Sequence, residues 1–266
     1  MILSAAPETL FALLAIAGYL LACAPAAPEW RWPVQVLTGA WGLHALVITA
    51  SVGMVAGSGE GLRLGFSPVL SCTGWLLLLV YGIESRFVPV TSVRRVMALC
   101  GAAAVLLAWA YPGEVRAVAQ SRWAPLHWVL GLTSYGLFGA AVLHALMLDA
   151  ADQRMRTKKT GPPTALGMPL LKLERMTYRF VEAGFVVLTL ALLIGLAEPH
   201  WRWADRKTVL SLLGWGTFAA LIVGRQWRGW RGRQATRWLY AGALLLLLAY
   251  VGSRFVTEVV LQRSGA

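Results

Sequence analysis

The run Leu244–Leu245–Leu246–Leu247–Leu248 is apolar on every side of the chain, and so is the run Leu76–Leu77–Leu78–Leu79–Val80. Strands of a membrane barrel would alternate apolar and polar residues at every second position, and these runs do not alternate. A helix satisfies its own backbone hydrogen bonds, so runs of this kind are stable in lipid as helices. The two runs therefore predict membrane-spanning helices.

The composition of the whole chain agrees with these two runs. Of its 266 residues, 58% are hydrophobic and 14% are charged, and the mean hydropathy is +0.63. An ordinary soluble domain has about 25% charged residues, so soluble, disordered and disulfide-stapled classes are excluded. A helix needs about 20 residues to cross the hydrocarbon layer. We expect an all-α, polytopic membrane protein with a single transmembrane domain over residues 1–266. Its eight expected spans are 8–27, 33–56, 65–84, 96–112, 125–148, 179–197, 208–225 and 237–257.

Lysine and arginine are unevenly distributed between the two sides of these spans. The loops after the first, third, fifth and seventh spans hold 16 of the 24 Lys and Arg residues. The positive-inside rule places these loops in the cytoplasm and both termini on the outer (periplasmic) side. The longest loop, 150–177, is then a cytoplasmic connector between a five-span and a three-span part. The net charge of +12 follows from this bias, so we expect membrane lipids as partners and no nucleic acid.

The sequence carries no motif of a hydrolase or of a thiol oxidoreductase. It has no glycine-rich phosphate loop, no HExxH, no serine-nucleophile elbow and no paired carboxylates within a span. Cys23, Cys72 and Cys100 lie in three different spans without a CxxC pair, which argues against a thiol relay and covalent haem attachment. We therefore predict no catalytic residues.

Four histidines are candidate metal ligands, and they differ in expected depth. His44 lies near the middle of the second span, where a histidine has either a polar partner or a ligand; both roles stay open. His127 opens the fifth span at its outer end, and His144 ends that span near the cytoplasmic face, where it can snorkel to the interface. About 25 Å of helix separates these two, so they cannot bind one metal together. His200 lies in the outer loop before the seventh span.

That outer loop also contains the stretch Trp201–Arg202–Trp203–Ala204–Asp205–Arg206–Lys207. Flat aromatic faces beside cations suit a planar ring that bears carboxylates, because Arg and Lys pair with carboxylates. The alternative is an aromatic belt at the membrane interface, with Asp205 as a helix cap.

Four stretches of the sequence carry a family resemblance. They are Leu43–Leu46 with Gly65–Ser71 and Trp75; Leu126–His127 with Thr133–Tyr135; Trp203–Thr208 with Leu213–Trp215; and Gly229–Arg233 with Gly252–Phe255. In their order and spacing the chain resembles the CcsA/CcmC-type cytochrome c assembly proteins, most closely the short eight-span HemX/YpjD-like branch. The resemblance extends over about residues 40 to 260.

The resemblance implies a haem-binding protein of the bacterial cytoplasmic (inner) membrane that acts in cytochrome c maturation or haem delivery. Its partners would be other cytochrome c assembly proteins or apocytochrome. Haem would be bound without covalent attachment, with His127 as an outer axial ligand, since neutral imidazole is a good ligand for haem iron. His44 matches the intramembrane histidine of the family. The outer loop would supply Trp201, Trp203, Asp205 and Lys207.

The chain also departs from the family pattern. The outer loop lacks a full Trp–Trp–Asp run, and Arg206 stands where the short branch carries a histidine. The second outer histidine of the larger relatives falls near the end of the last span, where this chain has Phe255, Glu258 and Val259. His200 is a candidate substitute.

We therefore expect an assembly factor rather than a complete haem lyase, since the large outer domain of a lyase is missing. One alternative is a HemX-like membrane regulator of haem biosynthesis, which would contact a soluble enzyme in the cytoplasm. The other is a small-solute transporter, which would use broken helices that meet at a mid-membrane site.

Overall fold

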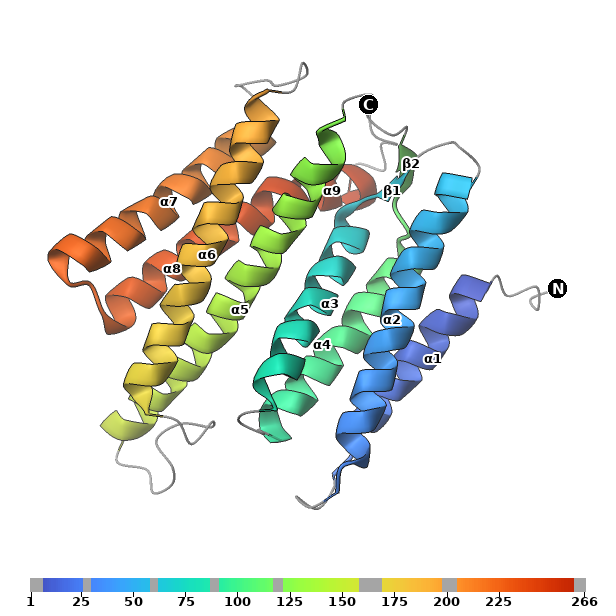
Figure 1. Cartoon of the computed structure of the whole chain (residues 1–266), viewed down its shortest axis with the longest axis horizontal. Coiled ribbons are helices and arrows are strands. Elements are labelled where there is room, and N and C mark those ends of the chain that lie inside the picture. Colours follow the sequence, from blue (N-terminus) through green and yellow to red (C-terminus); the bar gives the residue numbers. More distant parts are fainter. Residues whose placement is uncertain are drawn as a thin grey trace. The chain divides into compact units, whose positions relative to one another are not determined.

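The computed structural model describes residues 7–25, 30–57, 62–86, 91–116, 122–157, 169–197 and 205–260, and nearly all of these are helical. The contacts divide the chain into two compact units. Unit 1 comprises Met1–Val118 and Arg254–Ala266, and unit 2 comprises Ala119–Ser253. Figure 1 shows the elements of each unit in chain order.

Unit 1 contains four helices, a short ribbon and the last segment of the chain. Helix α1 packs against α2 and α4, and α3 packs against α4. The two strands pair antiparallel, with Arg63 opposite Val115; three-residue strands are too short to show an alternating pattern in the sequence. The elements are α1 (Pro7–Ala22), α2 (Trp32–Gly57), β1 (Leu62–Leu64), α3 (Phe66–Glu84), α4 (Thr91–Ala110), β2 (Glu114–Arg116), α9 (Ser253–Phe255, which begins at the last residue of unit 2) and the π-helical η2 (Val256–Val260).

Unit 2 contains the remaining helices, with α5 in contact with α6 and α8, and α7 in contact with α8. The sequence suggested a division after the fifth span, but α5 packs with the helices that follow it. Helix α5 continues to Arg156 and α6 begins at Leu170, so the helices extend into the expected 150–177 connector from both sides. The elements are α5 (Ala124–Arg156), α6 (Leu170–Leu196), α7 (Arg206–Arg228), α8 (Gly232–Leu247) and the π-helical η1 (Leu248–Gly252).

A stacked pair of phenylalanines forms the centre of unit 2. The rings of Phe138 and Phe218 lie 3.9 Å apart between centroids, at an interplanar angle of 12°. A Cβ atom on Gly242 of α8 would lie 2.9 Å from Phe218, and one on Gly184 of α6 would lie 3.0 Å from Phe138. Small residues are what allow helices to approach closely in membranes, so both glycines are required here by the packing.

The turn between α7 and α8 depends on the stretch Gly229–Trp230–Arg231–Gly232. Gly229 caps α7 with φ at 66°, in the left-handed region that favours glycine, and Gly232 has φ at 56°. Trp230 lies against Gly224 so closely that a Cβ there would come within 2.4 Å of its ring. This family-like stretch is therefore explained by turn geometry.

The described residues contain seven helices that are long and apolar enough to cross a membrane, all of them in the expected order. Helix α1 is also apolar, but its 16 residues extend only about 24 Å. Large apolar side chains point outward along the helices, for example Leu13 at 53% exposed and Val186 at 58%. The structure thus confirms a polytopic helical membrane protein, and the orientation of its termini stays a prediction.

Candidate functional site

His127 lies in the first turn of α5, one turn after Trp123. Its Nδ1 is 2.8 Å from the backbone oxygen of Ala191 in α6. A carbonyl oxygen only accepts hydrogen bonds, so the ring proton lies on Nδ1 and donates to Ala191. The Nε2 lone pair then points away from this bond and makes no hydrogen bond to any described residue. The side chain as a whole is half-buried.

The end of unit 2 that holds His127 also holds the start of α7. Ala191 is close to the end of α6, and the chain returns into α7 after Asp205 (Figure 1). Asp205 and Arg206 are exposed, and Lys207 is half-buried. Asp205 occupies the N-cap position but makes no side-chain cap hydrogen bond, so the capping role that we considered for it receives no support. Trp201, Trp203 and His200 lie outside the described residues.

About two turns into α7, the stretch Leu213–Gly214–Trp215 packs this helix against α6. The Trp215 Nε1 donates a hydrogen bond of 2.9 Å to Thr189 Oγ1, and its ring stacks on Phe185 at 5.5 Å between centroids. The Tyr135 hydroxyl of α5 donates to the backbone oxygen of Leu246 in α8. Two further parts of the family-like pattern therefore hold the helices of unit 2 together.

His44 lies in unit 1 and is fully buried. Its Nδ1 is hydrogen-bonded to the Tyr19 hydroxyl at 3.0 Å and its Nε2 to the Ser71 hydroxyl at 2.8 Å. A neutral imidazole donates through one nitrogen and accepts through the other, and a hydroxyl can do either. Both ring nitrogens are therefore satisfied by α1 and α3, which favours the packing role over the ligand role for His44.

His144 does not snorkel to the interface as the sequence allowed. It is 3% exposed, and its Nδ1 donates to the backbone oxygen of Ala140, one turn earlier in α5, at 2.8 Å. Its ring lies 5.2 Å from that of Phe180 in α6. It belongs to the α5–α6 interface, because the face of α5 that carries it is covered by α6.

Two of the residues at the family position of the second outer histidine, Phe255 and Glu258, make contacts within unit 1. The Phe255 ring meets the edge of Phe66 at 5.3 Å and 88°. Glu258 Oε2 lies 3.4 Å from the backbone nitrogen of Phe66, at the start of α3. A Cβ on Gly65 would lie 3.0 Å from this carboxylate and 2.9 Å from the backbone of Gly113, which explains the glycine before Phe66.

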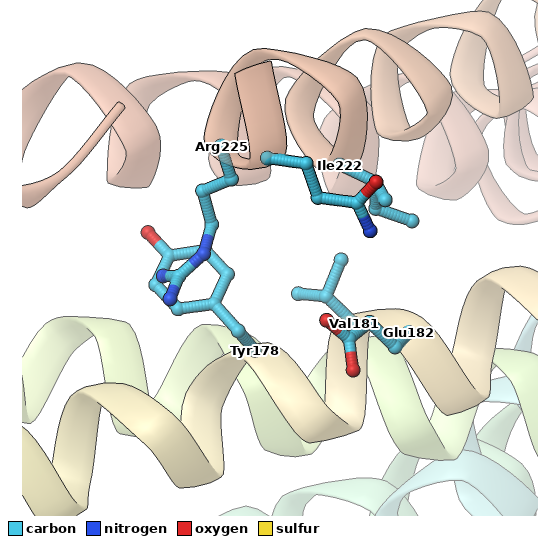
Figure 2. Close-up of a pocket in the computed structure, with 6 residues that line it drawn as sticks. Tyr178, Val181, Glu182, Ile222 and Arg225 are labelled. Carbon is cyan, nitrogen blue, oxygen red and sulfur yellow. The ribbon is translucent and has the colours of Figure 1, made fainter. Parts of the chain in front are cut away.

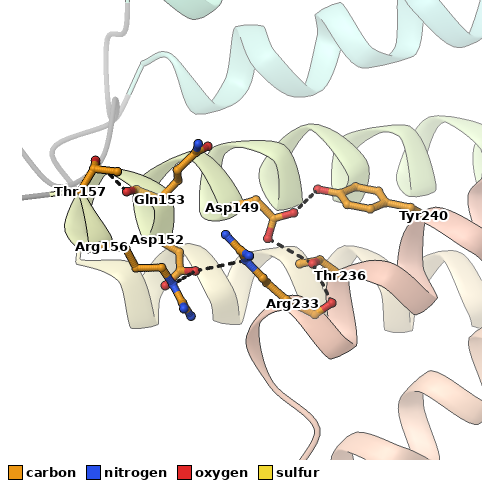
Figure 3. Close-up of polar contacts among 8 residues, drawn as sticks. All are labelled: Asp149, Asp152, Gln153, Arg156, Thr157, Arg233, Thr236 and Tyr240. Atoms are coloured by element: carbon orange, nitrogen blue, oxygen red, sulfur yellow. Dashed lines mark hydrogen bonds and ion pairs between the residues drawn. The ribbon is translucent and has the colours of Figure 1, made fainter. Parts of the chain in front are cut away.

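Sequence reasoning missed a polar cluster at the other end of unit 2 (Figure 3). Asp149 of α5 accepts hydrogen bonds from the Tyr240 hydroxyl at 2.8 Å and from Thr236 Oγ1 at 3.1 Å. Asp152 forms ion pairs with Arg156 at 2.9 Å and with Arg233 at 3.7 Å. The two acids lie three residues apart at the end of a long apolar run, and that spacing is the signal that identifies one helix face.

Comparisons with known proteins identify relatives over nearly the whole chain. The chain is 30% identical to the Inner membrane protein YpjD of Escherichia coli K12, over 94% of this chain and 98% of that protein. It is 24% identical to the Cytochrome c biogenesis protein CcsA of Chlamydomonas reinhardtii, over 73% of this chain and 54% of that protein. It is 32% identical to an uncharacterized 28.8 kDa protein of Azospirillum brasilense, over 60% and 61%. No solved structure matches the chain.

The family described as Cytochrome C assembly protein matches residues 63–261, which include α3 and all of unit 2. This match covers well over half of the chain, and it agrees with the resemblance to the CcsA-type proteins and to YpjD. With its apolar helices, the chain is a multi-pass protein of the bacterial inner membrane. It belongs to the cytochrome c assembly protein family.

Proposed function

We propose that this protein binds haem without covalent attachment and acts in cytochrome c maturation, by holding haem at the end of unit 2 where His127 lies. The family match and the CcsA relatives, whose name is Cytochrome c biogenesis protein, support the maturation role. The arrangement of His127 supports the haem site.

The hydrogen bond from His127 Nδ1 to Ala191 is the observation that carries the proposal. Metal-binding histidines generally donate their other ring N–H to a carbonyl or carboxylate, which fixes the tautomer and the ring plane. Here that bond is made by the backbone of a neighbouring helix, so it is built into the α5–α6 packing. His127 would then bind the haem iron through Nε2.

The surrounding residues fit a planar dicarboxylate such as haem. Arg206 and Lys207 begin α7 at the same end of unit 2, and Arg202 precedes them in the loop. These cations would pair with propionates, and Trp201 and Trp203 would offer flat faces. Asp205 would orient this basic stretch, and His200 is the candidate for a second ligand in the same loop.

His44 is not assigned to the iron in this proposal. Tyr19 and Ser71 occupy both of its ring nitrogens, and a metal would have to displace one of these bonds. The described residues contain no group of three metal-binding side chains, but haem iron needs only one or two protein ligands. His127 therefore carries the proposed site without a wider metal cluster.

When bound, haem supplies the redox-active iron and the vinyl groups of cytochrome c chemistry. The residues of the chain would hold and orient it: His127 would bind the iron, and the basic start of α7 would pair with the carboxylates. We infer an assembly factor, a role that the match to the cytochrome c assembly family supports.

The visible absorption spectrum of the purified protein tests the proposal. We expect a Soret band in protein from haem-replete cells, and its loss or shift in His127→Ala. His144→Ala is the matched control, since it removes an imidazole from the same helix away from this end. A wild-type protein that stays colourless after haem titration would contradict haem binding and favour the membrane regulator of haem biosynthesis.

A further inference from the structure

A pocket of about 240 Å³ lies between α6 and α7 of unit 2. The residues that line it are Tyr178, Val181, Glu182, Ile222, Arg225 and Gln226. Figure 2 shows Arg225 and Tyr178 at one end of the pocket and Val181 with Glu182 at the other. Glu182 precedes Ala191 by nine residues, about 14 Å of helix, so the pocket is separate from the proposed haem site.

The pocket lies where the charged part of each helix meets its uncharged part. On α6, Glu182 is the last charged residue before the uncharged stretch 183–197. On α7, Arg225 is the first charged residue after the uncharged stretch 208–224. Charged side chains are costly within the hydrocarbon layer. Glu182 and Arg225 therefore mark the depth at which both helices enter the headgroup region. The pocket therefore faces lipid headgroups rather than acyl chains.

The two ends of the pocket differ in their charge balance. The guanidinium of Arg225 is already paired with Glu174 at 3.4 Å and lies 3.4 Å above the centre of the Tyr178 ring. Glu182 has no ion-pair partner among the described residues. The uncompensated charge in the pocket is thus the carboxylate of Glu182, which favours a cationic group at that end.

The end of the pocket at Arg225 still offers hydrogen-bond donors. A guanidinium has five N–H donors, and the bond to Glu174 uses one of its terminal nitrogens. This end therefore suits an anionic oxygen, such as that of a phosphate.

Apolar side chains continue from the pocket toward the hydrocarbon. Val181 and Ile222 form apolar walls. Val186 lies four residues beyond Glu182, on the same face of α6, and is 58% exposed. An occupant with acyl chains would cover this surface, which a small polar solute would leave bare.

We propose that this pocket binds a zwitterionic aminophospholipid, with its primary ammonium at Glu182 and its phosphate at Arg225. The acyl chains lie along the uncharged parts of α6 and α7. An anionic lipid without an amine has no positive group to balance the Glu182 carboxylate. A choline headgroup carries no N–H donor for that carboxylate. Phosphatidylethanolamine therefore satisfies both ends of the pocket.

Native mass spectrometry of the full chain, released from micelles with equal amounts of phosphatidylethanolamine, phosphatidylglycerol and phosphatidylcholine, tests this proposal. We expect the wild type to retain phosphatidylethanolamine about fivefold or more over each other lipid, the effect of roughly one charge pair near a membrane surface. Glu182→Gln keeps the shape of the side chain and should abolish the preference. Asp152→Asn, which removes an acid outside the pocket, should keep it.

Two further measurements test whether the lipid binds in this pocket and whether its acyl chains are needed. Ile222→Trp fills the pocket and should lower retention of phosphatidylethanolamine, with helix content and size checked by circular dichroism and gel filtration. Glycerophosphoethanolamine, the same headgroup without acyl chains, should not displace the lipid at equal concentration. Equal retention of the three lipids, an unchanged preference in Glu182→Gln, or displacement by the free headgroup would overturn the proposal. Lipid retention is measured without the haem spectrum, so the lipid proposal can fail while the proposed haem function holds, and the reverse.

Discussion

The carboxylate of Glu258 accepts a hydrogen bond from the backbone N–H of Phe66, although 192 residues separate the two in the sequence. Glu258 also lies 3.9 Å from Arg254, and both side chains are about nine-tenths buried. Helix α3 begins at Phe66, and an acid at a helix N-terminus satisfies an N–H without an intrahelical partner and interacts favourably with the helix dipole. The last segment of the chain thus stabilises a helix from its first third.

This contact predicts the effect of removing the Glu258 carboxylate. Glu258→Ala should lower the free energy of unfolding by about 1–3 kcal/mol, because the backbone N–H of Phe66 loses its acceptor and the buried Arg254 loses its ion pair with Glu258. Thermal unfolding in detergent measures this. Asp205→Ala is the control, since Asp205 occupies a helix N-cap position without a side-chain cap bond. Equal loss in the two variants would contradict the capping role.

The close packing of Gly242 against Phe218 predicts a steric effect. Gly242→Ala should destabilise the protein by about 1–3 kcal/mol, because the new methyl group would overpack the centre of unit 2. In Gly216→Ala of α7, a new Cβ meets nothing within 4 Å, so this variant should unfold at the wild-type temperature or above. If both variants behave alike, the glycine effect comes from helix propensity and not from packing.

The hydrogen-bonded histidine of unit 1 predicts a loss of stability without a change in haem binding. Tyr19→Phe removes the hydroxyl bonded to His44, which should cost about 0.5–2 kcal/mol, the usual range for polar contacts between membrane helices. The Soret band should stay as in the wild type. A loss of the Soret band in Tyr19→Phe, with the fold intact, would return His44 to the candidate ligands.

The basic start of α7 predicts a loss of haem retention. The double change Arg206→Ala with Lys207→Ala should weaken retention about tenfold or more, if the cations pair with buried propionates. Trp203→Ala should do the same by removing an aromatic face. Trp227→Ala and Trp238→Ala are the controls, since these residues lie on α7 and α8 at the other end of unit 2. Equal retention in all variants would reduce the outer loop to an interface anchor.

The distribution of Lys and Arg predicts the orientation in the membrane. Alkaline phosphatase fused after Gly161 should be inactive, because the positive-inside rule places that loop in the cytoplasm, and a fusion after Ala266 should be active. The reverse pattern would move His127 to the cytoplasmic side. The haem site would then face the compartment of haem synthesis instead of the cytochrome partners.

The sequence alone determined the class, the order of the helices and the family, because transfer of apolar residues into lipid depends on local composition. Runs such as Leu244–Leu248 need no partner to favour a membrane helix. The sequence also identified His127 and the start of α7 as candidates, from residue types next to one another along the chain.

The tertiary structure alone decided which residues meet. His44 is held by Tyr19, 25 residues before it, and by Ser71, 27 residues after it, and the tautomer of His127 is set by a backbone oxygen of another helix. Tyr178, Glu182 and Arg225 line one pocket only because α6 and α7 lie side by side there. Each of these contacts joins residues far apart in the chain, and hydrogen bonds and ion pairs act over a few ångströms in space, which spacing along the sequence does not measure.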